Sequence, residues 1–87
     1  MNVLFNDESF EEFMELLISD RKLAIKVQKL IEDISRHPFE GIGKPEPLRH
    51  TLSGCWSRRI TDKHRLIYQV ENSVIKVVQC KYHYDDR

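Results

Sequence analysis

Apolar residues recur with helical spacing in two stretches of the first half of the chain. The stretches contain Phe10, Phe13, Met14, Leu17 and Ile18, and then Leu23, Ala24, Val27, Leu30, Ile31 and Ile34. This i, i+3, i+4, i+7 spacing predicts two amphipathic helices whose apolar faces belong to the core. Asn6 or Asp7 is suited to cap the first helix, and Pro38 ends the second. The short break at Ser19-Asp20 predicts that the helices pack as an antiparallel hairpin.

The second half of the chain is rich in residues that favour strands. Strands are predicted over Cys55–Thr61, Arg65–Val70 and Val74–Tyr84, with a short first strand over Asn2–Phe5. Short polar turns separate the last three, which predicts an antiparallel meander. Residues 37–54 hold all three glycines and all three prolines, so they are predicted to form a structured loop. The order β-α-α-β-β-β predicts an α+β fold, with the helical hairpin packed on one face of an antiparallel sheet.

The length of the chain and its charge distribution indicate the number of domains and the kind of surface to expect. A chain of 87 residues is expected to be a single domain, residues 1–87, with two layers and a modest core. The formal net charge is zero, but it is unevenly spread. Residues 1–35 hold 8 acids and 4 bases, whereas residues 36–68 hold 3 acids and 7 bases. The basic middle of the chain is either an anion-binding surface or an ordinary solvated one.

Cofactors and membrane insertion are not expected. Cys55 and Cys80 have neither CxxC nor Cys/His ligand spacing, so no metal or other cofactor is predicted. The N-terminal residues lack the basic segment and apolar run of a signal peptide, and no stretch has transmembrane length. These features predict a cytoplasmic protein with reduced thiols.

Three side chains stand out as candidates for acid–base chemistry. Glu46 lies between two prolines, which hold its carboxylate on a stiff segment with Lys44 and Arg49 nearby. Strand alternation places Arg65 and His83 on the polar face of the sheet, away from the predicted helices. A carboxylate, an arginine and a histidine on a basic background are what a metal-free ribonuclease needs. The alternatives are a plain surface turn, a solvated arginine and an exposed histidine.

Four segments together resemble the YoeB/Txe toxins of the RelE superfamily. They are HPFEGIGKPEPL (residues 37–48), LSGCWSRRIT (52–61), HRLIY (64–68) and CKYHY (80–84). The resemblance covers nearly the whole chain and implies a ribosome-dependent endoribonuclease that cleaves mRNA. It also implies a YefM-like antitoxin, a homodimer, and a toxin–antitoxin complex that binds operator DNA.

The resemblance also implies roles for individual residues. Glu46 matches the general base, Arg65 the group that stabilises the phosphate, His83 the general acid, and Tyr84 a residue that assists it. RNA or ribosome contacts are expected from Lys44, Arg49, Arg58, Arg59, Lys63 and Lys81.

The chain departs from the family pattern at two places. Cys55 replaces an aromatic residue, for which only a packing change is expected. The tail Asp85-Asp86-Arg87 adds two carboxylates beside His83, which either raise the pKa of the imidazole or have no effect.

Two other functions remain open from the sequence. One is a RelE-like toxin with another target, such as gyrase. Toxins of that kind lack the acid–base pair, so Glu46 and His83 argue against this function. A non-catalytic module that binds nucleic acid or a partner protein could keep the same fold and the same charge.

Overall fold

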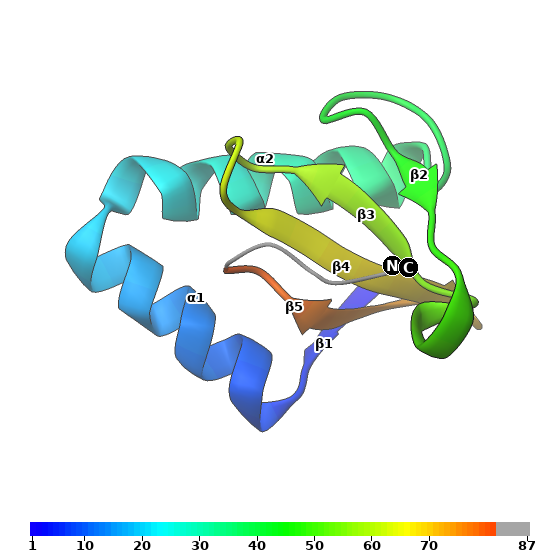
Figure 1. The fold of residues 1–87 in the computed structure, drawn as a ribbon, viewed down its shortest axis with the longest axis horizontal. Helices are drawn as coiled ribbons and strands as arrows, with labels where there is room; N and C mark the ends of the chain where they lie inside the picture. Colours follow the sequence, from blue (N-terminus) through cyan, green and yellow to red (C-terminus); the bar gives the residue numbers. More distant parts are fainter. Residues whose placement is uncertain (82–87) are drawn as a thin grey trace.

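The computed structural model describes residues 1–81, which fold into two α-helices packed on one face of a five-stranded sheet (Figure 1). The elements are β1 (Asn2–Phe5), α1 (Asp7–Ser19), α2 (Arg21–Arg36), β2 (Glu46–Pro47), the 3-10 helix η1 (His50–Leu52), β3 (Trp56–Arg59), β4 (Arg65–Glu71) and β5 (Val74–Gln79). The predicted α+β class, both helices and the helical hairpin are confirmed.

The helix boundaries follow the expected signals only in part. The Asn6 side chain accepts a hydrogen bond from the backbone N–H of Ser9 at 2.7 Å, and the Ser9 hydroxyl accepts one from the N–H of Asn6. This reciprocal capping box fixes the start of α1. Asp20 precedes α2, but its side chain makes no capping hydrogen bond. The second helix therefore depends on packing more than on its cap.

The two helices differ in how much of their apolar face they bury. In α2, Ala24, Val27, Leu30 and Ile34 are buried, as the spacing predicted. In α1, Leu16 and Ser9 are the buried residues, whereas Phe10 and Ile18 are 54% and 84% exposed. The prediction that the whole apolar stripe of α1 belongs to the core was therefore wrong. This helix contacts the sheet along a narrower face than its apolar residues cover.

The sheet has the strand order β1-β5-β4-β3-β2 and is mixed. The pairs β2–β3, β3–β4 and β4–β5 are antiparallel, which confirms the predicted meander. β1 instead pairs with β5 in parallel, so the expectation of a wholly antiparallel sheet was wrong for this strand. A hairpin forces antiparallel pairing only between strands that follow each other closely, and β1 and β5 do not. The β4–β5 turn has Asn72 and Ser73 at positive φ, as in the type I′ turns that suit hairpins.

Two details of the strands were not foreseen. Glu46–Pro47 forms the edge strand β2, although residues 37–54 were expected to be loop throughout. A bulge also interrupts β5: Ile67 pairs with Gln79 and Tyr68 with Val77, which leaves Val78 as an extra residue. The bulge reverses the alternation of faces, so Val78 and Cys80 lie in different clusters.

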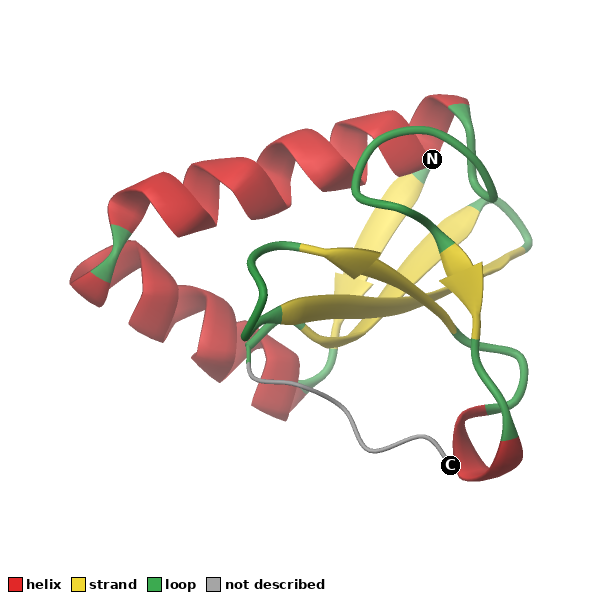
Figure 2. Cartoon of the chain, turned by 45° about the horizontal axis from the view of Figure 1, so that its top comes forward, coloured by secondary structure: helices red, strands yellow, loops and turns green. Residues whose placement is uncertain are grey.

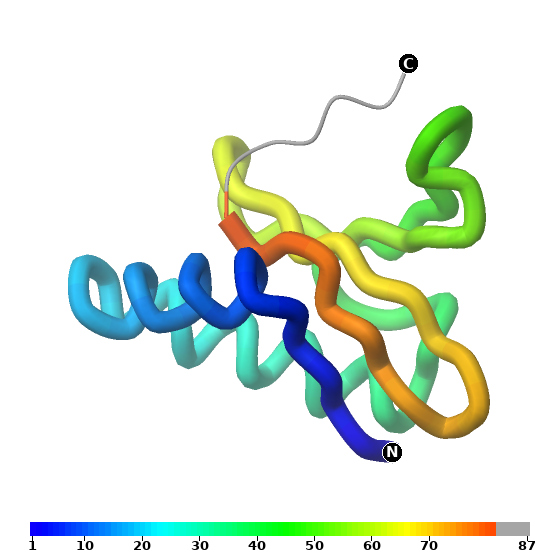
Figure 3. The backbone as a smooth tube through the Cα atoms, turned by 90° about the horizontal axis from the view of Figure 1, so that it is seen from below, coloured from blue at the N-terminus to red at the C-terminus, as the bar shows by residue number. Residues whose placement is uncertain are grey.

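The main core lies between the helices and the sheet. Its buried residues include Leu16, Val27, Leu30, Ile34, Ile60, Leu66, Tyr68, Ile75, Val77 and Cys80. A smaller cluster of Leu48, Cys55 and Ile67 lies on the opposite face, under the segment that contains η1. In Figure 3 the helices lie on one side of the sheet and this segment rises from the other. No helix among residues 1–81 is long and apolar enough to cross a membrane.

Replacing Leu30 by alanine should lower the free energy of unfolding by about 2–5 kcal/mol, because a fully buried side chain leaves a cavity. Leu30 is 1% exposed and lies at the centre of α2. Urea denaturation measures the loss. Ile25→Ala, at a 43% exposed position of the same helix, is the matched control and should change stability by about 0.5 kcal/mol or less. Equal losses in the two variants would contradict the assignment of this core.

Candidate functional site

Glu46 is placed by its pairing at the edge of the sheet. It lies opposite Ser57 of β3, Ser57 lies opposite Ile67 of β4, and Ile67 lies opposite Gln79 of β5. Residues directly opposite each other share a face, and Ile67 belongs to the cluster on the face away from the helices. The exposed carboxylate of Glu46 therefore belongs to a row of side chains on that face.

The next row on this face contains two arginines. Arg59 of β3 pairs directly with Arg65 of β4, two residues along from Ser57 and Ile67. With strands about 4.8 Å apart and about 3.4 Å per residue, the Cα atoms of Glu46 and Arg65 are roughly 12 Å apart. Long side chains at that separation can reach the same small group from two sides. The structure thus brings Glu46 and Arg65 to one face, as the strand alternation predicted for Arg65.

Arg65 is held by the turn that precedes its strand. Its Nη1 donates to the carbonyl oxygens of Thr61, Asp62 and His64, with distances of 3.0 Å to Asp62 and 3.1 Å to His64. The other guanidinium nitrogens make no hydrogen bond to residues 1–81. One nitrogen of the guanidinium is thus anchored to the turn.

The turn itself is a compact unit. The Thr61 hydroxyl accepts hydrogen bonds from the backbone N–H groups of Lys63 and His64 at 3.1 and 2.9 Å. Partial burial, with Lys63 and Lys81 nearby, lowers the pKa of His64 below its usual 6.5. The imidazole is therefore mainly neutral at neutral pH and adds little positive charge beside Arg65.

Arg59 and the exposed lysines complete the basic surface. Arg59 is exposed, and its Nη1 lies 3.5 Å from the carboxylate of Asp62. Lys44, Arg49 and Lys63 are also exposed and flank Glu46 or follow the turn at Thr61. These four residues are exposed, and their contact with RNA stays a prediction.

Arg58 is not on this surface, and the prediction that it contacts RNA does not fit the structure. Its side chain is fully buried on the helix side of β3, because residues 58 and 59 alternate faces. Its guanidinium binds Asp33 and several backbone carbonyls. Strand parity could have indicated this, since Arg58 has the same parity as Ile60, which is in the main core, and as Trp56, which packs against it.

Lys81 also has a structural partner. Its ammonium lies 2.6 Å from the carboxylate of Glu15 in α1. Nearby, the Glu12 carboxylate accepts a hydrogen bond from the backbone N–H of Cys80 at 2.9 Å, and partial burial raises the pKa of Glu12. Burial, with Glu12 beside it, raises the pKa of Cys80 to about 12, so its thiol stays protonated. The end of β5 is thus attached to α1, directly before His83 and Tyr84, which lie outside the described residues.

No three His, Cys, Asp or Glu side chains among residues 1–81 are grouped so that they could hold a metal ion.

The amino-acid sequence of the chain is similar to those of known bacterial toxins. A model of the YoeB-like toxins of bacterial type II toxin–antitoxin systems matches residues 5–84. The YoeB toxins of Escherichia coli K12 and Streptomyces coelicolor are 45% and 46% identical to the chain. Each alignment spans 84 residues, which is 97% of this chain and 100% of the relative.

Solved structures agree with the sequence comparison. A YoeB/ParE toxin from Agrobacterium tumefaciens superposes with a TM-score of 0.94 at 38% identity, covering 97% of this chain and 100% of that one. The toxin in a heterotetrameric YoeB–YefM complex from Staphylococcus aureus superposes with a TM-score of 0.90 at 42% identity, covering 97% and 98%. A YoeB dimer from the same organism gives 0.91 at 42% identity, with the same coverage.

Proposed function

Because the chain belongs to the family of YoeB-like toxins of bacterial type II toxin–antitoxin systems, we propose that it is a ribosome-dependent endoribonuclease that cleaves mRNA. Cleavage of the message would inhibit translation in the cytoplasm. The observation that carries the proposal is the placement of Glu46 and Arg65 in neighbouring rows of one sheet face. The family relationship was expected from the sequence and is confirmed.

In the proposed mechanism, Glu46 takes the proton of a ribose 2′-hydroxyl, and the oxygen attacks the adjacent phosphorus. Arg65 stabilises the negative charge that builds up on the phosphoryl oxygens. His83, assisted by Tyr84, gives a proton to the leaving 5′-oxygen. The products are a 2′,3′-cyclic phosphate and a 5′-hydroxyl. These groups supply every proton transfer and the charge stabilisation, so the mechanism needs no metal or other cofactor.

The pairing of Arg59 with Arg65 supports an anionic ligand on this face. Two like charges placed directly opposite each other on a sheet lower its stability. Carbonyl oxygens of the turn and the Asp62 carboxylate offset part of that cost. A phosphate placed between the two guanidinium groups would relieve the rest, because both arginines can donate to its oxygens. Lys44, Arg49 and Lys63 would add contacts to neighbouring phosphates of the mRNA or the ribosomal RNA.

A YefM-like antitoxin and a second copy of the toxin are the protein partners that we propose. The Staphylococcus aureus relatives were solved as a complex with YefM and as a dimer. The exposed apolar side chains of α1 support a protein partner, because contiguous apolar surface is typical of interaction sites. The complex of toxin and antitoxin would in turn bind operator DNA.

Protein that has been treated with excess EDTA and then freed of the chelator should cut mRNA on programmed ribosomes and leave a 2′,3′-cyclic phosphate and a 5′-hydroxyl. The reason is that the attacking oxygen comes from the RNA itself and the protons come from side chains. End analysis of the mRNA cleaved by chelator-treated and by untreated protein measures both properties.

Two results would contradict the proposal. A 3′-hydroxyl product would exclude attack by the 2′-oxygen. Intact mRNA after incubation with folded protein would favour another target or a non-catalytic binding module.

A further inference from the structure

Arg58 is fully buried, and the loop between α2 and β2 is wrapped around its guanidinium. Its Nε donates to the Tyr68 hydroxyl at 3.1 Å, and its Nη1 lies 2.5 Å from the Asp33 carboxylate. Its remaining bonds go to the carbonyl oxygens of His37 (2.5 Å), Glu40 (2.7 Å) and Ile42 (3.2 Å). A buried charge is tolerated only when it is paired and fully hydrogen-bonded, and this guanidinium meets both conditions.

The partners of Arg58 bind the same loop. Tyr68 donates its hydroxyl proton to the carbonyl of Pro38 at 2.8 Å, and burial raises the pKa of Tyr68, which keeps that proton in place. The Asp33 carboxylate accepts the backbone N–H of Ile42 at 3.1 Å. Arg58 lowers the pKa of Asp33 below its usual 3.8, so this ion pair stabilises the fold above that pH and weakens as the pH falls further.

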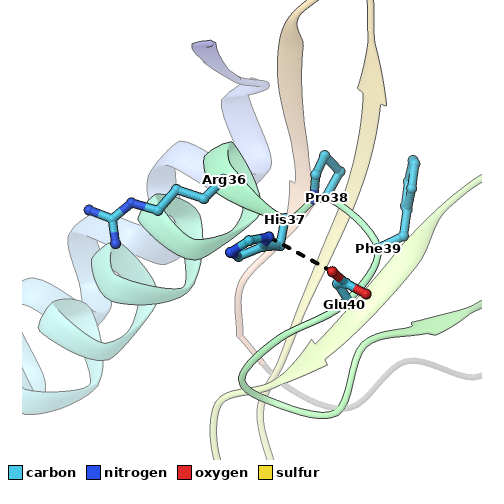
Figure 4. A pocket seen from close by; sticks show the side chains of 5 residues that line it. All are labelled: Arg36, His37, Pro38, Phe39 and Glu40. Carbon is cyan, nitrogen blue, oxygen red and sulfur yellow. Dashed lines mark ion pairs between the residues drawn. The ribbon is translucent and has the colours of Figure 1, made fainter.

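Side chains of the loop make further contacts outside this network. Figure 4 shows His37 and Glu40 facing each other across a shallow pocket at the C-terminal end of α2, with 3.9 Å between Nδ1 and Oε1. Phe39 packs on Trp56 with ring centroids 4.8 Å apart. The loop is therefore held by its backbone carbonyls at Arg58 and by the packing of Phe39 on Trp56.

Two glycines bring the loop backbone against Arg58. A Cβ on Gly41 would lie 2.1 Å from the Asp33 carboxylate, and one on Gly43 would lie 3.2 Å from the Arg58 Cβ. Both have positive φ, of 115° and 80°, which side chains disfavour. The loop backbone thus lies close to the Arg58–Asp33 pair at both glycines.

The loop leads directly to Glu46. The carbonyl of Gly43 accepts the backbone N–H of Arg59 at 2.6 Å, and three residues later Glu46 pairs with Ser57 in β2. Figure 2 shows the loop arching from the end of α2 to β2. β2 has only two residues, so its pairing with β3 is short. The loop on one side and Leu48 in its small cluster on the other add to the anchoring of this strand.

We propose that Arg58 is a positioning residue for Glu46: the buried guanidinium holds the loop 37–43, and through it the carboxylate on the opposite face of the sheet. The inference rests on the proposed function, because it assumes that Glu46 acts as the base. A purely structural arginine would be expected to bind core elements, and a buried ion pair of that kind is often replaceable by apolar residues. Arg58 instead directs three of its bonds to the backbone of one loop.

The test is Arg58→Lys, which keeps the charge but replaces a five-donor planar fork by a single ammonium. Single-turnover cleavage on programmed ribosomes should slow by about 10²-fold, the effect of a displacement of about 1 Å at a reacting group. Binding to the ribosome should be unchanged, because no group on the basic face is altered. Tyr68→Phe removes only the hydroxyl that joins Arg58 to Pro38 and should give a smaller loss. Arg21→Lys, at an exposed position at the start of α2, is the matched control.

The decisive comparison is made in a Glu46→Gln background. There Arg58→Lys should cause no further loss, because a misplaced base and an absent base are equivalent. Hydrogen exchange of the Ile42 amide should also become faster in Arg58→Lys, whereas exchange of the Phe10 amide in α1 should not. If Arg58→Lys fails to fold, Tyr68→Phe is compared in the two backgrounds instead.

Three outcomes would overturn the inference. Losses that multiply in the double variant would mean that Arg58 acts independently of Glu46. Arg58→Lys at the wild-type rate would mean that the loop needs no such anchor. Glu46→Gln at the wild-type rate would overturn the assignment of the base, and the inference with it; this third result is recognised from the single variant alone.

Discussion

Replacing Glu46 by glutamine should lower the single-turnover rate of mRNA cleavage by about 10²–10⁴-fold, the usual contribution of a general base. The amide has the shape of the carboxylate but cannot accept the proton of the 2′-hydroxyl. Glu46 is exposed in a two-residue edge strand, so the substitution should leave the folded state and ribosome binding intact. Rates measured with ribosomes in excess over toxin isolate the chemical step from release.

Glu71→Gln is the matched control for this experiment. Glu71 is also an exposed strand carboxylate, but it lies at the other end of the sheet, next to the β4–β5 turn. It should cleave at the wild-type rate. A Glu46→Gln variant within a few-fold of wild type would show that another group, from the protein or the ribosome, removes the proton.

The helices could be predicted from the sequence because their apolar periodicity is strong, but the depth of their burial could not. Periodicity states which residues share a face, and it does not state what covers that face. In α2 the sheet covers Val27, Leu30 and Ile34. In α1 the sheet reaches Leu16, and Phe10 and Ile18 remain exposed in the single chain.

The pairing of strands could be predicted where hairpins connect neighbouring strands, and the prediction was wrong for β1. Local turns such as Asn72-Ser73 determine the pairing of β4 with β5. No local signal reports that β1 joins β5 in parallel, since these strands are separated by most of the sequence. The bulge at Val78 is equally invisible, because one extra residue changes no residue type.

The face on which Arg65 lies could be predicted from the sequence, but the burial of Arg58 was not predicted. Arg65 lies on the face that strand alternation indicated, and Arg59 is paired with it. Arg58 was grouped with them by charge, although its parity places it toward the helices. Its partners are mostly backbone carbonyls, and a sequence shows nothing of where carbonyls point. The burial of Arg58 can therefore be inferred from strand alternation, but the groups that accept its hydrogen bonds cannot.

Replacing Arg65 by alanine should lower the cleavage rate by about 10²–10³-fold, the loss that follows from removing one donor to a charged transition state. Arg65 is anchored through Nη1 to carbonyls of the turn at 61–64, which orients its other donors before any substrate arrives. Such preorganisation acts on the charge that develops during the reaction, so the fall should appear in the single-turnover rate rather than in ribosome affinity. Arg65→Lys should recover only part of the rate, because an ammonium cannot bind the carbonyls and the phosphate in the same geometry.

Arg36→Ala, at an exposed position at the end of α2, controls for the loss of one positive charge and should cleave normally. Circular dichroism and binding to the antitoxin establish that Arg65→Ala is folded, which matters because the removed hydrogen bonds also brace the turn. If the variant lost activity together with its fold, the arginine would be a brace for the β3–β4 turn. If it stayed folded and bound ribosomes several-fold more weakly with an unchanged single-turnover rate, Arg65 would serve RNA binding rather than the chemical step.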